Sequence, residues 1–243
     1  MGTAWAQSGE DEWVDLFNGK DLSGWETWLS RAPGERTMLG LNNDPLKVFT
    51  VQDGMIYISG QVFGGLTTID EYEDFHLLVE FKWGEKKWPP RQNQARDGGI
   101  SYYATGAHGV FAGSFMKSNQ FQLQEGGTGD FYSVAGTIAD VEAVRDGDDW
   151  RYAPGGEKTT INRGRVLASS HPESPVGEWN TVEIIATGDS IRHVVNGETV
   201  LVLTDPRHVV DGAEQPLRRG KFQIQSEGAD LWIRKVRIKT PVK

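Results

Sequence analysis

The chain has 243 residues, of which 37% are hydrophobic and 24% charged, and its formal net charge is −9. These values suit a globular domain and, with no basic cluster, argue against nucleic-acid binding; no apolar run approaches the roughly 20 residues of a membrane span. The absence of cysteine excludes disulfides, thiolate catalysis and cysteine-bound metals.

The first residues resemble the end of a secretion signal. Ala4-Trp5-Ala6 before Gln7 fits an A-x-A cleavage site, and an ordinary flexible terminus is the alternative. We therefore expect export to the periplasm or the extracellular space, with residues 1–12 as a signal remnant. Residues 13–243 are expected to form one domain, because no linker or composition shift divides them.

Short strands joined by turns are predicted for most of the chain. Asp53-Gly54 and Asn196-Gly197 are typical of two-residue β-hairpins, and each lies between two apolar alternating stretches. The one helical expectation is a short turn over 113–118. The predicted strands cover residues 48–52, 55–59, 75–83, 99–104, 120–124, 181–186, 191–195, 199–203, 220–225 and 231–239. Many strands without alternating helices predict an antiparallel sandwich or jelly roll.

The segment from 136 to 175 differs from the rest, because it is rich in Gly, Asp, Arg and Pro and has weak periodicity. A long irregular segment inside a compact domain is usually functional or mobile. We expect loops here that lie over one sheet or its rim and that determine the specificity for the ligand.

Two near-identical stretches carry a ladder of amides. Residues 121–125 read Phe-Gln-Leu-Gln-Glu, and residues 222–227 read Phe-Gln-Ile-Gln-Ser-Glu. Side chains alternate across a strand, so the apolar residues face a core and the glutamines face the other side. Amides donate and accept hydrogen bonds, as sugar hydroxyls do. A carbohydrate-binding surface is therefore the first hypothesis, and a solvated sheet face is the alternative.

The opening block Trp13-Val14-Asp15-Leu16-Phe17-Asn18-Gly19 and the closing block around Phe222-Gln223-Ile224-Gln225 resemble the 3-keto-disaccharide hydrolase domain family. Where many members read Asn-Ser-Gly-Ile, this chain reads Asp97-Gly98-Gly99-Ile100. The resemblance covers about 13–238. It implies an all-β, concanavalin A-like jelly-roll sandwich of two antiparallel sheets. It also implies an exported carbohydrate-active enzyme that acts on glycosides oxidised at C3.

A ketone at C3 makes a distinct cleavage chemistry available. The ketone acidifies the C2 proton, and the glycosidic oxygen on C1 is then a β-leaving group. Elimination needs a base for that proton, donors for the enolate oxygen and an acid for the leaving oxygen. A divalent metal ion is a further way to stabilise the enolate, although the sequence contains no typical metal-ligand spacing. Water addition to the unsaturated sugar completes hydrolysis.

Five side chains are candidate catalytic residues. The alternation of the strand places Glu80 and Lys82 together on its polar face. Glu80 is a candidate base, and Lys82 is a candidate partner for the enolate oxygen. The alternative is a structural ion pair between them. Glu227 shares the parity of its glutamine neighbours. Glu125 has the opposite parity and reaches the site only if a bulge or the end of the strand redirects its side chain. His193 is a candidate acid or base, and a buried structural histidine is the alternative.

The sugar-binding candidates surround the amide ladders. Aromatic rings near these strands offer stacking platforms, whereas Trp83 and Trp179 are expected in the core. The predicted substrate-binding residues are Gln122, Gln124, Gln223, Gln225, Tyr103, Asp97, Asp130 and Trp88. The expected partner is thus an oxidised glycoside. Two other functions fit the same surface: a non-catalytic carbohydrate-binding module, and a conventional glycosidase with two carboxylates.

Overall fold

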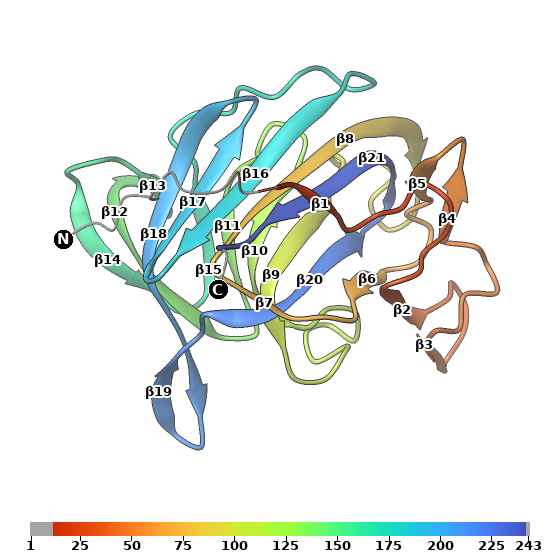
Figure 1. Cartoon of the computed structure of the whole chain (residues 1–243), viewed down its shortest axis with the longest axis horizontal. Helices are drawn as coiled ribbons and strands as arrows, with labels where there is room; N and C mark the ends of the chain where they lie inside the picture. Colours follow the sequence, from red (N-terminus) through yellow and green to blue (C-terminus); the bar gives the residue numbers. More distant parts are fainter. Residues whose placement is uncertain (1–11, 242–243) are drawn as a thin grey trace.

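The computed structural model describes residues 12–241, which form 21 β-strands and no helix, arranged as two stacked layers (Figure 1). In the first layer the pairing order is β3 (Met38–Leu41), β2 (Trp25–Arg31), β6 (Gly64–Thr68), β20 (Arg219–Ser226), β9 (Gly99–Thr105), β10 (Lys117–Gln122), β11 (Phe131–Val134) and β15 (Gly164–Leu167). Each of these pairs is antiparallel, as expected for strands joined by short turns.

The second layer contains the longest strands. Its order is β4 (Phe49–Gln52), β5 (Met55–Ile58), β21 (Ala229–Lys239), β8 (Phe75–Lys87), β16 (Asn180–Thr187), β17 (Ser190–Val195), β18 (Glu198–Val210), β12 (Thr137–Asp146) and β14 (Glu157–Ile161). Strand β13 (Asp149–Tyr152) joins the layers at one edge, because it pairs with both β12 and β15. This arrangement confirms the predicted jelly-roll sandwich.

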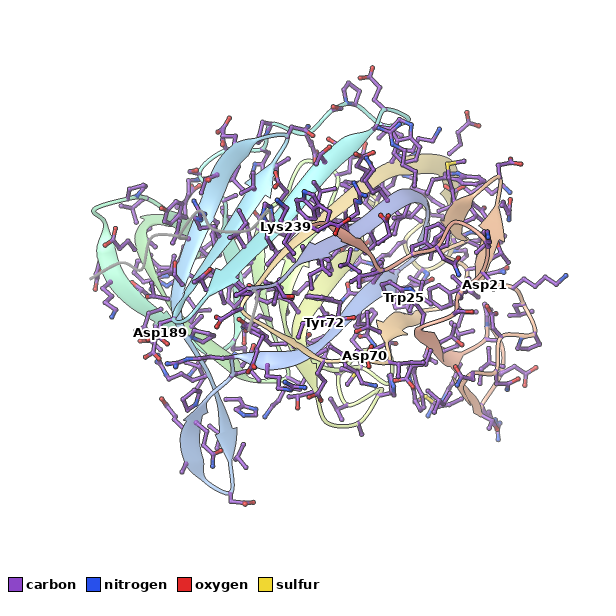
Figure 2. All side chains as sticks on the ribbon, viewed as in Figure 1. Asp21, Trp25, Asp70, Tyr72, Asp189 and Lys239 are labelled. Atoms are coloured by element: carbon purple, nitrogen blue, oxygen red, sulfur yellow. The ribbon has the colours of Figure 1, made fainter. Side chains whose placement is uncertain are left out.

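Three short strands complete the fold. Strand β1 (Val14–Asp15) pairs with the end of β21, and β7 (Tyr72–Glu73) pairs with the start of β20. Tyr72 of β7, which is labelled in Figure 2, stacks on Phe222 of β20 with ring centroids 5.0 Å apart. Strand β19 (Ala213–Pro216) forms a hairpin with the end of β18 that projects away from both layers (Figure 1).

The hydrophobic core lies between the layers and is built from the apolar parity of each strand. Phe75 of β8 contacts Phe222 of β20 across the core, with ring centroids 4.7 Å apart. Phe121 of β10 also contacts His193 of β17 across the core, with ring centroids 4.5 Å apart. Phe121, Phe222 and Ile224 are buried, as their alternation predicts.

Both predicted hairpin turns are present. Asp53-Gly54 connects β4 to β5, and Asn196-Gly197 connects β17 to β18. All four residues have positive φ, between 48° and 85°. This is the conformation that a tight two-residue hairpin requires and that Asn, Asp and Gly tolerate best.

Two predictions of local structure are wrong. The 136–175 segment is not mainly loop, because 137–167 holds strands β12 to β15. Its glycines lie in or beside the turns, and most of its charged residues are exposed, although Asp140 is buried. The turn expected over 113–118 lies earlier, where Ser114 N and Phe115 N both donate to Phe111 O, and Lys117 already begins β10.

The described part of the chain contains no helix able to cross a membrane. The predicted cleavage site at residues 4–7 lies outside the described residues, so export remains a prediction.

Candidate active site

Strand register aligns polar residues across the first layer. Residues paired directly in neighbouring antiparallel strands share one face of a sheet. Successive pairings connect seven positions, which we call the polar row: Glu26, Thr67, Gln223, Ser101, Gln120, Tyr132 and Arg165. The polar row runs on the face of the first layer that points away from the core, and it joins both amide-bearing strands on one surface.

The glutamines of this face form a directed chain of hydrogen bonds. Gln225 Nε2 donates to Gln120 Oε1 at 2.9 Å, and Gln120 Nε2 donates to Gln122 Oε1. Gln122 Nε2 then donates to Asp97 Oδ1 at 2.6 Å, while Gln124 Nε2 donates to Asp97 Oδ2 at 3.1 Å. The chain ends on a carboxylate, which accepts but does not donate when ionised. The amides are thereby fixed in one orientation.

Two glycines make room for these side chains. A Cβ at Gly99 would lie 2.6 Å from Gln120 Nε2 and 2.8 Å from Gln225 Oε1. A Cβ at Gly65 would collide with the side chain of Gln223. The amides therefore cross β9 and β6 where those strands have no side chain, and this is how glutamines from separate strands come into contact.

A pocket of about 340 Å³ opens on this face. Its size lies near the lower end of the range typical of small-molecule sites. The pocket is lined by Arg91, Asp97, Phe111, Phe115, Gln120, Gln122, Gln124, Tyr132, Arg165 and Glu227. Amides and charged groups thus form its floor and ends, and aromatic rings form a wall. Phe111 and Tyr132 meet edge to face, with centroids 6.4 Å apart.

Two carboxyl groups share one guanidinium in the pocket. Arg91 Nη1 lies 2.7 Å from Asp97 Oδ2, and Arg91 Nη2 lies 2.9 Å from Glu227 Oε1. The side chains of Asp97 and Glu227 are only 4% and 13% exposed. Burial and the nearby charge of Asp97 raise the pKa of Glu227 to about 8, although Arg91 opposes this. Burial also raises the pKa of Asp97, against the effect of Arg91.

The proton shared by this pair belongs on Glu227. Asp97 receives donors from Gln122, Gln124, Arg91 and the Gly98 N–H, all of which stabilise its charged form. Among the described residues, Glu227 accepts a hydrogen bond from Arg91 alone. At neutral pH the pocket therefore holds an ionised Asp97 and a Glu227 that gains and loses a proton near physiological pH.

A loop between β8 and β9 delivers Arg91 and Asp97 to the floor. Trp88 anchors this loop: its backbone N–H donates to Gly228 O at 2.7 Å, and its indole N–H donates to Ser59 O at 2.9 Å. The Arg91 stem lies against Gly228, where a Cβ would come within 2.9 Å of Arg91 Cβ. Trp88 does not line the pocket and holds the loop in place instead.

The opposite end of the pocket is formed by Arg165. Its Nη1 donates to Gln124 Oε1 at 3.3 Å and lies 3.8 Å from Asp130 Oδ2. Asp130 is fully buried behind the pocket, where its Oδ1 accepts from Ala168 N at 2.7 Å and pairs with His171 Nε2 at 2.8 Å. Asp130 therefore supports Arg165 rather than lining the pocket.

The structure separates Glu80 and Lys82 from the amide ladders, so the predicted common face is wrong for them. Both lie on β8, in the second layer, whose polar face points to the opposite side of the molecule. Glu80 pairs with Arg234 and Lys235, and Lys82 Nζ lies 5.1 Å from the Trp179 ring centroid. Trp179 is only half-buried on that face, whereas Trp83 is in the core. The alternation of side chains predicts which residues share a face of one strand. It does not predict which of the two layers that strand joins.

His193 and Tyr103 also lie away from the pocket. His193 is fully buried between the layers, with Nε2 3.0 Å from Tyr102 Oη and Nδ1 2.9 Å from Gly129 O. Tyr103 has a positive φ of 53° at a register shift in β9, so its ring turns into the core against Phe75. Both are core residues, contrary to the predicted roles.

Glu125 lies beside the pocket without lining it. Its Oε2 accepts from Arg96 N at 3.2 Å and from Arg96 Nη1 at 3.1 Å. The strand does end before it, as its predicted role required, since β10 stops at Gln122. The carboxylate is nevertheless committed to Arg96 outside the lining.

Residues 12–241 contain no group of three or more His, Asp or Glu side chains placed to hold a metal ion.

A family model for the 3-keto-alpha-glucoside-1,2-lyase-like domain matches residues 12–239. The chain belongs to this family. The match spans both layers and every pocket residue, and the family description indicates a carbohydrate-active protein. Comparison with curated proteins gives no match.

Solved structures resemble this lyase-like domain in fold. A candidate glycosyl hydrolase from Parabacteroides distasonis is 18% identical, with a TM-score of 0.58, and the match covers 98% of this chain and 99% of that one. A Bacillus subtilis protein with a galectin-like fold is 10% identical, with a TM-score of 0.53 and 96% of each chain covered. The kappa-carrageenase of Pseudoalteromonas carrageenovora is 11% identical, with a TM-score of 0.50 and full coverage of both chains.

The pocket residues that sequence reasoning missed include the polar residues Gln120, Arg91 and Arg165 and the aromatic residues Phe111 and Phe115. Gln120 had a signal, because it shares the parity of Gln122 and Gln124. Arg91 lies between the predicted strands 75–83 and 99–104, and Arg165 lies in the segment expected to be irregular. Neither arginine had a local signal in the sequence, because the position of each in the pocket depends on how segments distant in the sequence pack together.

Proposed function

We propose that the protein cleaves the glycosidic bond of 3-keto-glycosides by elimination across C2 and C1. The observation that carries this proposal is Glu227, a buried carboxyl with a pKa near 8 that shares Arg91 with Asp97 at the pocket floor. General-base removal of a C–H proton is most efficient when the pKa of the base lies near the working pH. Glu227 in its ionised form meets that condition.

The proposed step is balanced within the pocket. Glu227 takes the C2 proton, the electrons of that C–H bond form the enolate, and Arg91 binds the enolate oxygen at C3. The enolate then re-forms the ketone as a C1–C2 double bond appears and the C1–O bond breaks. The proton on Glu227 passes to the departing oxygen, so the products are an unsaturated 3-keto sugar and an alcohol. Addition of water to the double bond gives net hydrolysis.

The remaining residues suit recognition of the sugar. Gln120, Gln122 and Gln124 offer amide donors and acceptors to hydroxyl groups. Phe111 and Tyr132 offer ring surfaces to the C–H face of a pyranose. Asp97 holds the amides in one orientation and keeps Arg91 in place. A divalent metal ion as enolate partner, also expected from the chemistry, is tested by chelation.

The decisive experiment compares a 3-keto-disaccharide with its unoxidised parent, each with and without a chelator. We expect cleavage of the oxidised sugar only, and transient absorbance of an enone. Glu227→Gln should lower kcat by about 10²–10⁴-fold, the usual contribution of a general base. Glu80→Gln is the matched control, because it makes the same substitution on the opposite face of the molecule. The activity of this variant should equal that of the wild type.

The other outcomes identify the competing functions. Equal cleavage of the parent sugar would replace this proposal with a two-carboxylate glycosidase. Binding of both sugars without turnover would indicate a carbohydrate-binding module. If a chelator abolishes activity and added divalent metal restores it, a metal ion stabilises the enolate oxygen, and Arg91 does not do so alone.

A further inference from the structure

The polar row is longer than the pocket that opens on it. Gln120, Tyr132 and Arg165 line the pocket, whereas Glu26, Thr67 and Gln223 continue the polar row across β2, β6 and β20. Gln223 Nε2 donates to Thr67 Oγ1 at 2.9 Å, so the two halves have the same amide and hydroxyl chemistry. We call Glu26, Thr67 and Gln223 the covered half.

The segment 106–116, between β9 and β10, covers this half. Met116 N donates to Gln223 Oε1 at 3.1 Å, which places the end of the segment directly on the polar row. Further along, Gly113 O accepts from the indole N–H of Trp28 at 3.1 Å. Trp28 is two residues beyond Glu26 on β2 and therefore lies on the same face.

The start of the segment is fixed to the far end of the polar row. The His108 ring stacks on Trp28 with centroids 5.6 Å apart, and His108 Nε2 lies 3.1 Å from Glu26 Oε1. Glu26 Oε1 also receives Lys221 Nζ at 2.6 Å. The segment is thus attached at Glu26, Trp28 and Gln223, over the whole covered half.

The boundary between the halves is an aromatic wall. Phe111 and Phe115 both line the pocket, and Phe115 is 5% exposed. Phe111 and Phe115 are also bridged by a backbone hydrogen bond of 3.0 Å, which makes the wall a single compact turn. A ligand in the pocket meets this wall before it can reach Gln223.

Polar atoms at the boundary have no hydrogen-bond partner among the described residues. These are Ser101 Oγ, which lies in the polar row between Gln223 and Gln120, and Gln225 Oε1, which lies above Gly99. Both residues are at least 99% buried. A buried polar atom without a hydrogen bond is energetically unfavourable. The floor under the segment is therefore polar and incompletely satisfied, as in a surface built to meet polar groups.

We propose that the 106–116 segment limits the length of the glycan that this site binds. It closes the covered half, so that the ligand occupies the pocket and cannot extend across β20, β6 and β2. Without the segment, the polar row would be a groove across seven strands able to bind additional sugar units. This inference rests on the proposed carbohydrate function but not on the cleavage chemistry, so binding tests it separately.

The structure suggests a variant that retains the strands. Thr105 and Lys117 are paired directly in β9 and β10, so the segment is an eleven-residue connection within a hairpin. Replacing residues 106–116 with Asn-Gly closes that hairpin with a two-residue turn. A second variant, Phe111→Ala/Phe115→Ala, removes only the wall. Val110→Ala is the control, because Val110 lies in the same segment but is 55% exposed.

The test measures binding of unoxidised α-1,4- and β-1,4-linked glucose oligomers of one to six units by calorimetry. For the better-bound series, the ratio of dimer Kd to hexamer Kd should be about tenfold larger in the hairpin or wall variant than in the wild type, since about 1.4 kcal/mol of added contact corresponds to tenfold in Kd. Val110→Ala should match the wild type. If the hairpin variant unfolds, the wall variant decides.

An equal length dependence in the wild type and in the folded variants would overturn this inference and leave the proposed function standing. Binding of no oligomer by any of the proteins would also overturn this inference, whereas the proposed function is judged separately by cleavage of the 3-keto-disaccharide. Normal binding without cleavage of 3-keto-glycosides would overturn only the proposed chemistry.

Discussion

Asp97 and Glu227 are both bound by the guanidinium of Arg91, with contacts of 2.7 and 2.9 Å. Because two buried carboxyls share this one guanidinium and repel each other, one of them holds a proton more strongly than usual. The amide ladder determines which one, because it donates to Asp97. The glutamines therefore act on the chemistry of Glu227 as well as on sugar hydroxyls.

The first prediction concerns the pH dependence of cleavage. Because the pKa of Glu227 is raised to about 8 and the proposed base is its ionised form, kcat/KM should rise with pH through about 8. A pH–rate profile of 3-keto-disaccharide cleavage measures this. A profile that falls through the same region would assign Glu227 as the acid instead.

The same titration has a consequence for stability. A raised carboxyl pKa favours the folded state fully below the unfolded value of about 4.5, and this contribution is lost as pH rises toward about 8. Glu227→Gln removes the titration, so its melting temperature relative to the wild type should increase from pH 5 to pH 8. Thermal unfolding at several pH values measures the difference. A difference that is constant with pH would contradict a buried, titrating Glu227.

Glu80→Gln provides the control with the opposite expectation. Partial burial raises the pKa of Glu80, but hydrogen bonds from Lys235 and Arg234 bring it below the ordinary value. Its charged form therefore stabilises the folded state above pH 4.5, and Glu80→Gln should be no more stable than the wild type at pH 8.

The second prediction concerns Gly228 as the support of Arg91. Gly228→Ala places a Cβ 2.9 Å from Arg91 Cβ at a φ of +86°. We expect Arg91 to be displaced and kcat to fall at least tenfold, with a stability cost of about 1 kcal/mol from the backbone conformation. Gly177→Ala is the control, because its φ is +89° with nothing within 4 Å. If both variants keep full activity, Gly228 does not position Arg91.

The third prediction tests the amide ladder. Gly99→Ala introduces a Cβ within 2.8 Å of both Gln120 and Gln225, so the hydrogen bond between these side chains should break. KM for the 3-keto-disaccharide should rise at least about tenfold, as expected when buried polar groups lose their partners. Gly98→Ala is the control, because its nearest atom is 3.5 Å away. Equal KM values for the two variants would show that the ladder has no part in binding.

Local patterns predicted the features that depend on neighbouring residues. The Asp53-Gly54 and Asn196-Gly197 turns, and the shared face of Gln122, Gln223 and Gln225, follow from turn chemistry and the period of two. The family resemblance predicted the jelly roll, which the strand order confirms.

The errors arise where distant segments meet. Glu80 has the same alternation as Gln223, but its strand joins the other layer, and no local pattern distinguishes the layers. Tyr103 left its expected face through a register shift in β9. Arg91 reaches the floor because a loop is anchored by Trp88, which a sequence pattern does not specify.

The fourth prediction assigns His193 to stability. Burial lowers the pKa of His193 to about 4, against the effect of its hydrogen bond with Gly129 O. A lowered histidine pKa means that the unfolded state takes up its proton first, so stability should fall as pH decreases from about 6.5 to about 4. His193→Gln does not titrate and should flatten this part of the pH–stability curve.

His193→Gln should also lower stability at pH 7 by about 1–3 kcal/mol if Tyr102 Oη or Gly129 O is left unpaired. Urea unfolding at pH 4.5 and 7 measures both effects, and the kcat of the folded variant at pH 7 should stay within about twofold of the wild type, because a group that only packs the core contributes no transition-state contact. A large loss of kcat in a fully folded variant would instead place His193 in the chemistry.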